Sequence, residues 1–162
     1  MSPGTRVRPI TCMNLLDCCW NDTYIVHPPP EPEANLARIL IVEDSADNMR
    51  LFEAVLALAG HTTVGLADGH GLVAAIERER VDLVLMDIQL PACDGYTLLE
   101  EIRSTGHKTV PVVALTAHAM SGDEERALEA GFDAYITKPI DVREFPQTIA
   151  KVLSRKAGTE IA

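Results

Sequence analysis

Short apolar runs alternate with amphipathic segments along most of the chain, from residue 38 to about residue 153. The run at 39–42 is apolar at every position, which is the pattern of a strand buried on both faces of a sheet. The next segment, 47–59, instead repeats its apolar residues at helical spacing, with Phe52 and Leu56 on one face. The chain therefore begins this region as a strand followed by a helix.

The same alternation recurs and predicts five strand–helix units. The predicted strands occupy 39–42, 62–67, 83–86, 110–115 and 134–137, and the predicted helices occupy 47–59, 71–79, 96–103, 121–131 and 142–153. The fourth helix is expected to open on a capping box at 121–124 and to stop at Gly131. Buried strands that each lead into a helix indicate a parallel sheet covered on both sides, and right-handed crossovers leave few ways to wind it. We therefore expect an α/β fold, a doubly wound (βα)5 sandwich with a five-stranded parallel sheet.

The ends of the chain lack this alternation. Residues 1–36 show no sustained period and include a proline-rich stretch at 28–33, so they are interpreted as a flexible N-terminal extension. An alternative is that translation starts further downstream, near Val26 or Leu36. The remainder divides into one domain at 37–154 and a C-terminal tail at 155–162.

Composition excludes several classes of function. With 162 residues and 47% apolar content, the chain suits a single domain with a packed core. The net charge of −10 and the absence of a Lys/Arg run argue against a nucleic-acid partner. No apolar run reaches the ~18 residues that a membrane span needs, so a cytoplasmic protein without membrane contact is expected. The four cysteines, Cys12, Cys18, Cys19 and Cys93, form no Cys-x-x-Cys pair, which disfavours zinc and disulfides.

Polar residues follow four of the predicted strands. Glu43 and Asp44 follow the first strand, Asp87 the third, Thr116 the fourth, and Lys138 the fifth. Ligands of such sheets bind beyond the carboxyl ends of the strands, so these side chains are expected to converge on one edge. Three carboxylates brought together there would repel one another unless a hard cation or an ammonium neutralised them. Mg²⁺ and Lys138 meet that need.

This arrangement suits phosphoryl chemistry. Mg²⁺ prefers oxygen ligands and keeps several waters, and the backbone carbonyl of Gln89 can join the carboxylates. With its charge screened, Asp87 can attack a phosphoryl group as a nucleophile and form an acyl phosphate. Thr116 can then hydrogen-bond a phosphoryl oxygen.

Four short blocks on these strand ends resemble the signature blocks of CheY-like response-regulator receivers, over about residues 38–153. They are Val42-Glu43-Asp44, Leu85-Met86-Asp87-Ile88-Gln89-Leu90-Pro91, Ala114-Leu115-Thr116-Ala117 and Lys138-Pro139. The stretches 43–49 and 117–126 are most similar to single-domain receivers such as DivK, and receivers attached to hybrid histidine kinases carry similar stretches. The resemblance implies the flavodoxin-like/CheY-like form of the expected fold.

The resemblance assigns roles to the acidic residues. It implies that Asp44 is a direct Mg²⁺ ligand and that Glu43 acts through water. Asp87 would be both ligand and phosphoacceptor, and the Gln89 carbonyl would complete the protein's share of the metal site.

The resemblance also implies a switch. Thr116 would be the switch hydroxyl, and Tyr135 the aromatic side chain that turns inward when Thr116 moves toward the phosphoryl group. Lys138 would pair with Asp87 or its phosphate, and the Lys138–Pro139 peptide bond is expected to be cis.

The function that follows is a stand-alone receiver in a two-component phosphorelay. A phosphohistidine of a sensor histidine kinase or of a histidine phosphotransfer protein would supply the phosphoryl group. A downstream protein partner would read the face made by the fourth helix, fifth strand and fifth helix, because no effector segment follows residue 153. The chain would catalyse only its own phosphorylation and dephosphorylation.

Three alternatives belong to other classes. A receiver-like module could bind its partner regardless of phosphorylation, or the domain could serve as a phosphate sink. A hydrolase of the phosphatase type also uses an Asp nucleophile with Mg²⁺, but Gln89 stands where the second Asp of its Asp-x-Asp arrangement belongs. The glycines near 65–71 match neither the dinucleotide fingerprint nor a P-loop.

Overall fold

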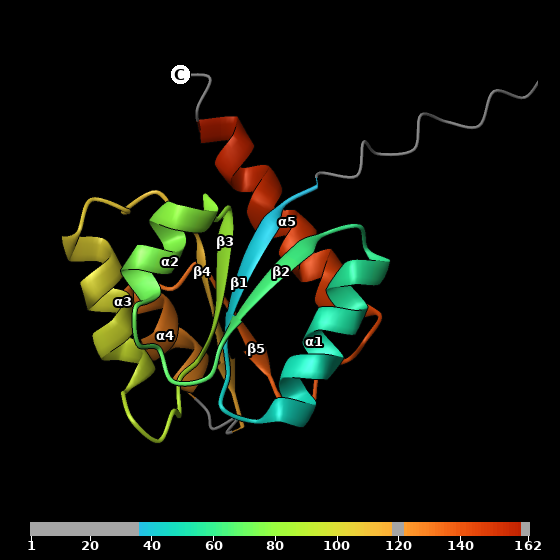
Figure 1. Cartoon of the computed structure of the whole chain (residues 1–162), viewed down its shortest axis with the longest axis horizontal. Helices are drawn as coiled ribbons and strands as arrows, with labels where there is room; N and C mark the ends of the chain where they lie inside the picture. The colour runs from blue at the N-terminus through green and yellow to red at the C-terminus, as the bar shows by residue number, and fades with distance from the viewer. Residues whose placement is uncertain (1–35, 118–121, 160–162) are drawn as a thin grey trace, which may run out of the picture. The chain divides into compact units, whose positions relative to one another are not determined.

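The computed structural model describes residues 36–117 and 122–159, and the N-terminal extension predicted for 1–36 lies outside this part except for Leu36. Five strands form one parallel sheet in the order β2-β1-β3-β4-β5 (Figure 1). The strands are β1 (Arg38–Val42), β2 (Thr62–Leu66), β3 (Leu83–Asp87), β4 (Val112–Thr116) and β5 (Ala134–Thr137). This topology confirms the predicted doubly wound α/β sandwich.

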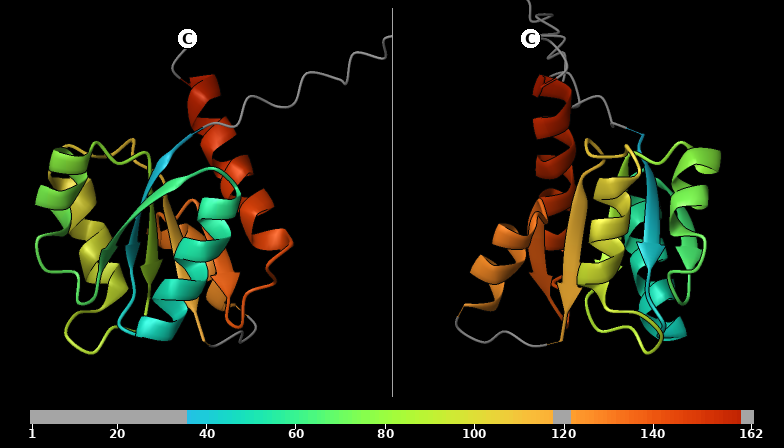
Figure 2. Two further views of the ribbon diagram at one scale, coloured as in Figure 1. Left: turned by 45° about the vertical axis from the view of Figure 1, so that its right-hand side comes forward. Right: turned by 90° about the vertical axis from the view of Figure 1, so that its left-hand side faces the viewer.

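Five helices cover the two faces of the sheet. They are α1 (Ala46–Leu58), α2 (Leu72–Glu79), α3 (Gly95–Ser104), α4 (Asp123–Ala130) and α5 (Glu144–Thr159). The helices α1 and α5 lie on one face, and α2, α3 and α4 lie on the other (Figures 1 and 2). The inner strands β1, β3 and β4 are therefore buried on both sides, as their apolar runs predict, whereas the edge strands β2 and β5 are only partly buried.

The β1 strand shows how the core is divided. Ile39 and Ile41 pack in the cluster beneath α1 and α5, whereas Leu40 and Val42 pack in the cluster beneath α2, α3 and α4. All four side chains are fully buried. Burial of each side chain contributes about 1.5–3 kcal/mol relative to an exposed one. This inner strand is therefore a rigid support for Glu43 and Asp44, which follow it.

Four element boundaries differ from the prediction by two residues or more, and three of them are in β4 and α5. β4 begins at Val112 rather than at 110, because Pro111 has no N–H to give to the sheet ladder. α5 begins at Glu144 and continues to Thr159, so the helix includes residues assigned to the C-terminal tail. The apolar period that suggested an end at 153 stops with the buried Val152 and Leu153, and the next two residues of the helix, Ser154 and Arg155, are exposed. No helix in these described ranges is long and apolar enough to cross a membrane.

The start of α4 also differs. Gly122, in the left-handed conformation with φ 100°, precedes the first helical residue, and the helix has no side-chain cap. The predicted capping box placed Ser121 in this role, and Ser121 lies outside the described residues. The stop at Gly131 is confirmed, again in the left-handed conformation that favours glycine.

Gly95, the first residue of α3, packs directly on the backbone of β3. A Cβ at this position would lie 2.8 Å from the carbonyl oxygen of Asp87 and 2.8 Å from the Cα of Ile88. Because both neighbours are backbone atoms, they cannot move without displacing Asp87 itself. We therefore expect Gly95→Ala to lower the free energy of unfolding by about 1–3 kcal/mol, measured by urea unfolding.

Gly65 provides the matched control for this substitution. A Cβ there would meet the sulfur of Met49 at 3.0 Å, which is the far part of a flexible side chain. Gly65→Ala should therefore cost clearly less than Gly95→Ala. Equal losses in the two variants would contradict the close approach at Gly95.

Candidate functional site

The predicted site residues lie at the carboxyl edge of the sheet. Glu43 and Asp44 directly follow β1, Asp87 and Thr116 are the last residues of β3 and β4, and Lys138 directly follows β5. The strands β1, β3, β4 and β5 are neighbours in this order. The parallel register therefore brings together groups that are far apart along the chain.

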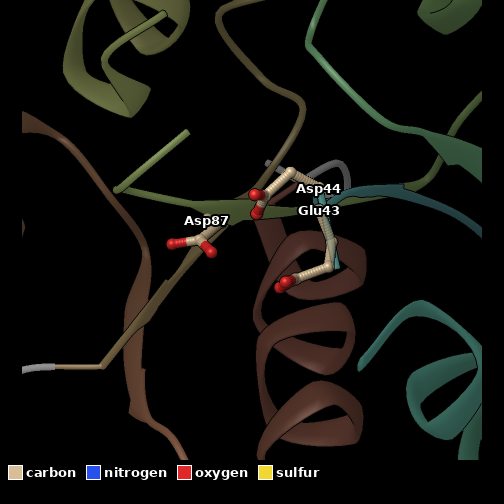
Figure 3. Close-up of side chains that lie close together, drawn as sticks. All are labelled: Glu43, Asp44 and Asp87. Atoms are coloured by element: carbon tan, nitrogen blue, oxygen red, sulfur yellow. The ribbon is translucent and has the colours of Figure 1, made fainter. Parts of the chain in front are cut away.

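Three carboxylates form the centre of this edge. Each of Glu43, Asp44 and Asp87 offers an oxygen atom, and these atoms all lie within 4.8 Å of one another (Figure 3). Glu43 is only 1% exposed and Asp87 only 4%, whereas Asp44 is exposed. The cluster thus joins two buried charges to one that faces solvent.

Lys138 neutralises part of this charge. Its Nζ donates to Oε2 of Glu43 at 2.6 Å and also to Oδ2 of Asp87. Burial alone lowers the pKa of the ammonium, but hydrogen bonds to Asp87 and Glu43, together with their negative charges, raise this pKa above its ordinary value. The backbone holds the residue in place, since its N–H donates to the Thr116 carbonyl at 2.7 Å and its bond to Pro139 is cis, as expected.

Further donors fix the two buried carboxylates. The backbone N–H of Gln89 donates to Oδ1 of Asp87 at 2.9 Å. Oε1 of Glu43 accepts from the side-chain amide of Asn48 at 2.9 Å and from the backbone N–H of Ser45 at 3.3 Å. Asn48 was not among the predicted site residues. In the sequence, only its position five residues after Glu43 could have indicated that it contacts the site.

The residues of this edge fit a hard divalent cation. Lys138 brings one positive charge to three carboxylates, so a net negative charge stays at the strand ends. All the side-chain groups offered by the cluster are oxygens, the ligands that Mg²⁺ prefers. Asp44, exposed at the rim, leaves the cluster open to an ion arriving from solvent.

The two predicted switch residues lie on neighbouring strands. Thr116, which is 5% exposed, ends β4, and Tyr135 is half-buried on β5. Burial raises the pKa of the Tyr135 phenol, a side-chain hydrogen bond with Thr116 opposes this rise, and the negative charges of Asp123 and Glu124 add to it. The pKa of Tyr135 is raised on balance, so its neutral form is favoured in the folded chain.

This raised pKa predicts a late step in a tyrosine titration. The stabilisation from neutral Tyr135 is present below the unfolded-state pKa of ~10 and is lost as the pH rises through the folded-state value. Alkaline titration of phenolate absorbance should therefore show a step above the ordinary tyrosine range, and Tyr135→Phe should remove that step. An unchanged titration curve in Tyr135→Phe would contradict the assignment.

A cavity of about 340 Å³ lies elsewhere in the domain. Its lining includes Lys108 and Pro111, which precede β4, Asp133, which precedes β5, and Arg155 of α5. It shares no residue with the acidic cluster. The candidate chemistry therefore lies on the carboxyl edge of the sheet and not in this cavity.

Comparisons with known proteins agree with this geometry. The model of the response regulator receiver domain matches residues 39–150. The polar-differentiation response regulator DivK of Brucella anthropi is 40% identical over 116 residues, which are 71% of this chain and 94% of DivK. The sensor protein GacS of Pseudomonas syringae pv. syringae is 37% identical over 126 residues, but the chain spans only 14% of the length of GacS.

Solved structures show the same fold. The receiver domain of the sensor histidine kinase PA1611 from Pseudomonas aeruginosa PAO1, solved with a magnesium ion in its active site cleft, is 39% identical with a TM-score of 0.66. The match covers 73% of this chain and 98% of that one. A CheY-like receiver from Methanospirillum hungatei JF-1 is 31% identical with a TM-score of 0.69, and the match covers 76% and 98%. Fold, acidic edge and sequence together show that this chain belongs to the family of response-regulator receiver domains of two-component systems.

Proposed function

We propose that this chain accepts a phosphoryl group on Asp87, in a Mg²⁺-dependent reaction in the cytoplasm, and that the aspartyl phosphate switches its binding to a partner protein. The donor would be a phosphohistidine of a sensor histidine kinase or of a histidine phosphotransfer protein. The observation that carries this proposal is the buried Asp87 carboxylate, which shares Lys138 with Glu43 and lies beside Asp44. This carboxylate is oriented by its donors and lies beside a second carboxylate that is exposed to solvent.

The transfer is a simple displacement at phosphorus. A carboxylate oxygen of Asp87 forms a bond to phosphorus while the bond from phosphorus to the histidine nitrogen breaks. The nitrogen keeps the bonding electron pair, and the imidazole leaves neutral when its other nitrogen carries a proton. No other substrate is needed, so Asp87 is consumed as the acceptor until water hydrolyses the acyl phosphate.

The metal would be held by this chain's own oxygen atoms. Asp44 and Asp87 are proposed as direct ligands with the Gln89 carbonyl, and Glu43 as a partner through water. Bound Mg²⁺ would screen the negative charge of the transferring phosphoryl oxygens. That Gln89 donates its N–H to Asp87 supports this assignment, because the same residue orients the acceptor.

Lys138 and Thr116 are proposed to stabilise the product. Lys138 already donates to Asp87, so it can follow the charge onto the new phosphate. Thr116 ends the neighbouring strand, and its hydroxyl is proposed to hydrogen-bond a phosphoryl oxygen. Both groups are held by β4, β5 and the turn after β5.

The output is proposed to pass through Thr116 and Tyr135 to the face made by α4, β5 and α5. The side-chain hydrogen bond between Thr116 and Tyr135 supports this route, because a shift of the hydroxyl toward a phosphate changes the partner of the phenol. A module that binds regardless of phosphorylation would not need the paired Lys138 and carboxylates. Their presence favours the phosphorylation switch over that alternative.

The test uses acetyl phosphate as a small phosphodonor. We expect the chain to gain the mass of one phosphoryl group in the presence of Mg²⁺ and not in the presence of a chelator. The adduct should be removed by hydroxylamine, as an acyl phosphate is, and peptide mapping should place it at Asp87. No adduct with Mg²⁺ present, or an adduct on another residue, would overturn the proposal.

A further inference from the structure

The Glu43 carboxylate is held from both sides by donors of the protein. Its Oε1 accepts from the Asn48 side-chain amide at 2.9 Å and from the Ser45 backbone N–H at 3.3 Å. Its Oε2 accepts from the Lys138 ammonium at 2.6 Å. Because Glu43 is 1% exposed, little water is available to replace any of these donors.

This division of contacts limits what Glu43 can do for a cation. A carboxylate offers about four acceptor positions, and three of them are occupied here. The remaining position is on Oε2, the oxygen that also contacts Lys138. Glu43 therefore cannot coordinate a cation with both oxygens, whereas the carboxylate of the exposed Asp44 faces solvent.

Asn48 is well placed to maintain this state. Ser45 is the N-cap of α1, and its hydroxyl accepts a hydrogen bond from the backbone N–H of Asn48 at 3.4 Å. This bond fixes the backbone of the first helical turn. The side-chain amide can then reach back to the end of β1 without moving the helix. Of the donors described for Glu43, Asn48 and Lys138 act through side chains and Ser45 acts through the backbone.

We propose that Asn48 is a positioning residue of the phosphorylation site, which holds the buried Glu43 carboxylate in the orientation that faces Lys138 and the metal position. This inference rests on the proposed function, because it concerns the same Mg²⁺ site. Asn48 touches neither the acceptor nor the phosphoryl group, and it acts through Glu43. Losing its amide leaves the buried Glu43 carboxylate short of one orienting donor, so the carboxylate can turn away from Lys138 and the metal position.

The test is a Mg²⁺ titration of the full chain without any phosphodonor, followed by NMR shifts of backbone amides. We expect Asn48→Ala to weaken Mg²⁺ binding about tenfold, the lower end of the effect of removing groups that orient metal ligands. Alanine is the best helix former, so loss of α1 does not explain a weaker site. Asp44→Ala provides the reference for loss of a direct ligand.

Arg50→Gln is the matched control on the same helix. Its side chain is exposed, and losing its positive charge would favour cation binding if it had any effect. We expect Mg²⁺ affinity to be unchanged or slightly raised in this variant. Affinity lowered equally in Arg50→Gln and Asn48→Ala would mean that the helix, and not the Asn48 amide, is responsible.

A double-mutant cycle separates positioning from general damage. If Asn48 acts through Glu43, then Asn48→Ala should change the Mg²⁺ affinity of a Glu43→Gln background less than about twofold. At saturating Mg²⁺, phosphorylation of Asn48→Ala by acetyl phosphate should recover most of the parent rate. A tenfold loss that persists in the Glu43→Gln background, or unchanged Mg²⁺ affinity in Asn48→Ala, would overturn the inference.

The outcomes also separate this inference from the proposed function. A parent chain that binds Mg²⁺ and is phosphorylated, beside an Asn48→Ala variant that behaves identically, overturns the positioning role and leaves the proposed function intact. A parent chain without any response to Mg²⁺ overturns both.

Discussion

Replacing Asp87 with asparagine is expected to abolish phosphoryl uptake from acetyl phosphate. The amide has nearly the shape of the carboxylate and its oxygen can still accept from the Gln89 N–H, so the loop after β3 should keep its position. The amide is not a carboxylate nucleophile, however, and cannot form an acyl phosphate. Intact mass after incubation with donor and Mg²⁺ should show no adduct.

Asp68→Asn is the matched control for this substitution. Asp68 is an exposed acid whose Oδ1 accepts from the His70 backbone N–H, a contact that an asparagine oxygen can also make. This variant should gain the phosphoryl mass as the parent does. Undiminished labelling of Asp87→Asn would place the acceptor on another residue and refute the assignment.

Replacing Lys138 with methionine is expected to cost about 3–5 kcal/mol of unfolding free energy, measured by urea denaturation without Mg²⁺. The Lys138 side chain is 14% exposed and its ammonium contacts both buried carboxylates, so its loss leaves Glu43 and Asp87 as uncompensated charges. Added Mg²⁺ should recover more stability in this variant than in the parent, because the ion supplies the missing positive charge. Phosphorylation should fall as well.

Lys151→Met tests whether the effect belongs to the site. Lys151 is exposed on α5, so removing its charge should change stability by less than about 0.5 kcal/mol. If Lys138→Met proved as mild as Lys151→Met, the ion pairs at the strand ends would not be what holds the two buried carboxylates.

The parallel sheet and its two covering layers could be predicted because the pattern of apolar residues within each strand is a local property of the sequence. A run such as 39–42 is apolar throughout only when both faces are covered, and this pattern identified the sheet and its layers. The convergence of Glu43, Asp44 and Asp87 followed from the parallel direction of the strands. Boundaries were less predictable where a backbone property decided them, as at Pro111, or where a helix continued past its apolar repeat, as α5 does after Leu153.

The features that escaped prediction depend on contacts between elements. Asn48 looks like an ordinary residue near a helix start, and its bond to Glu43 appears only when the end of β1 and the start of α1 are placed together. Gly95 reads as a turn residue until the Asp87 backbone is seen against it. Both are tertiary properties, for which the local sequence pattern carries little information.

The ion pairs of Lys138 have a consequence for the order in which the protein becomes competent. Lys138 lies 95 residues after Glu43 and 51 residues after Asp87, on the far side of α4 and β5 along the chain. A ribosome-bound chain that has emerged only as far as β4 already carries the proposed phosphoacceptor and both acidic partners, but not the Lys138 ammonium that contacts Glu43 and Asp87. Under the proposed function, phosphoryl uptake would therefore begin late in synthesis, when the fifth strand docks and brings Lys138 to the acidic cluster.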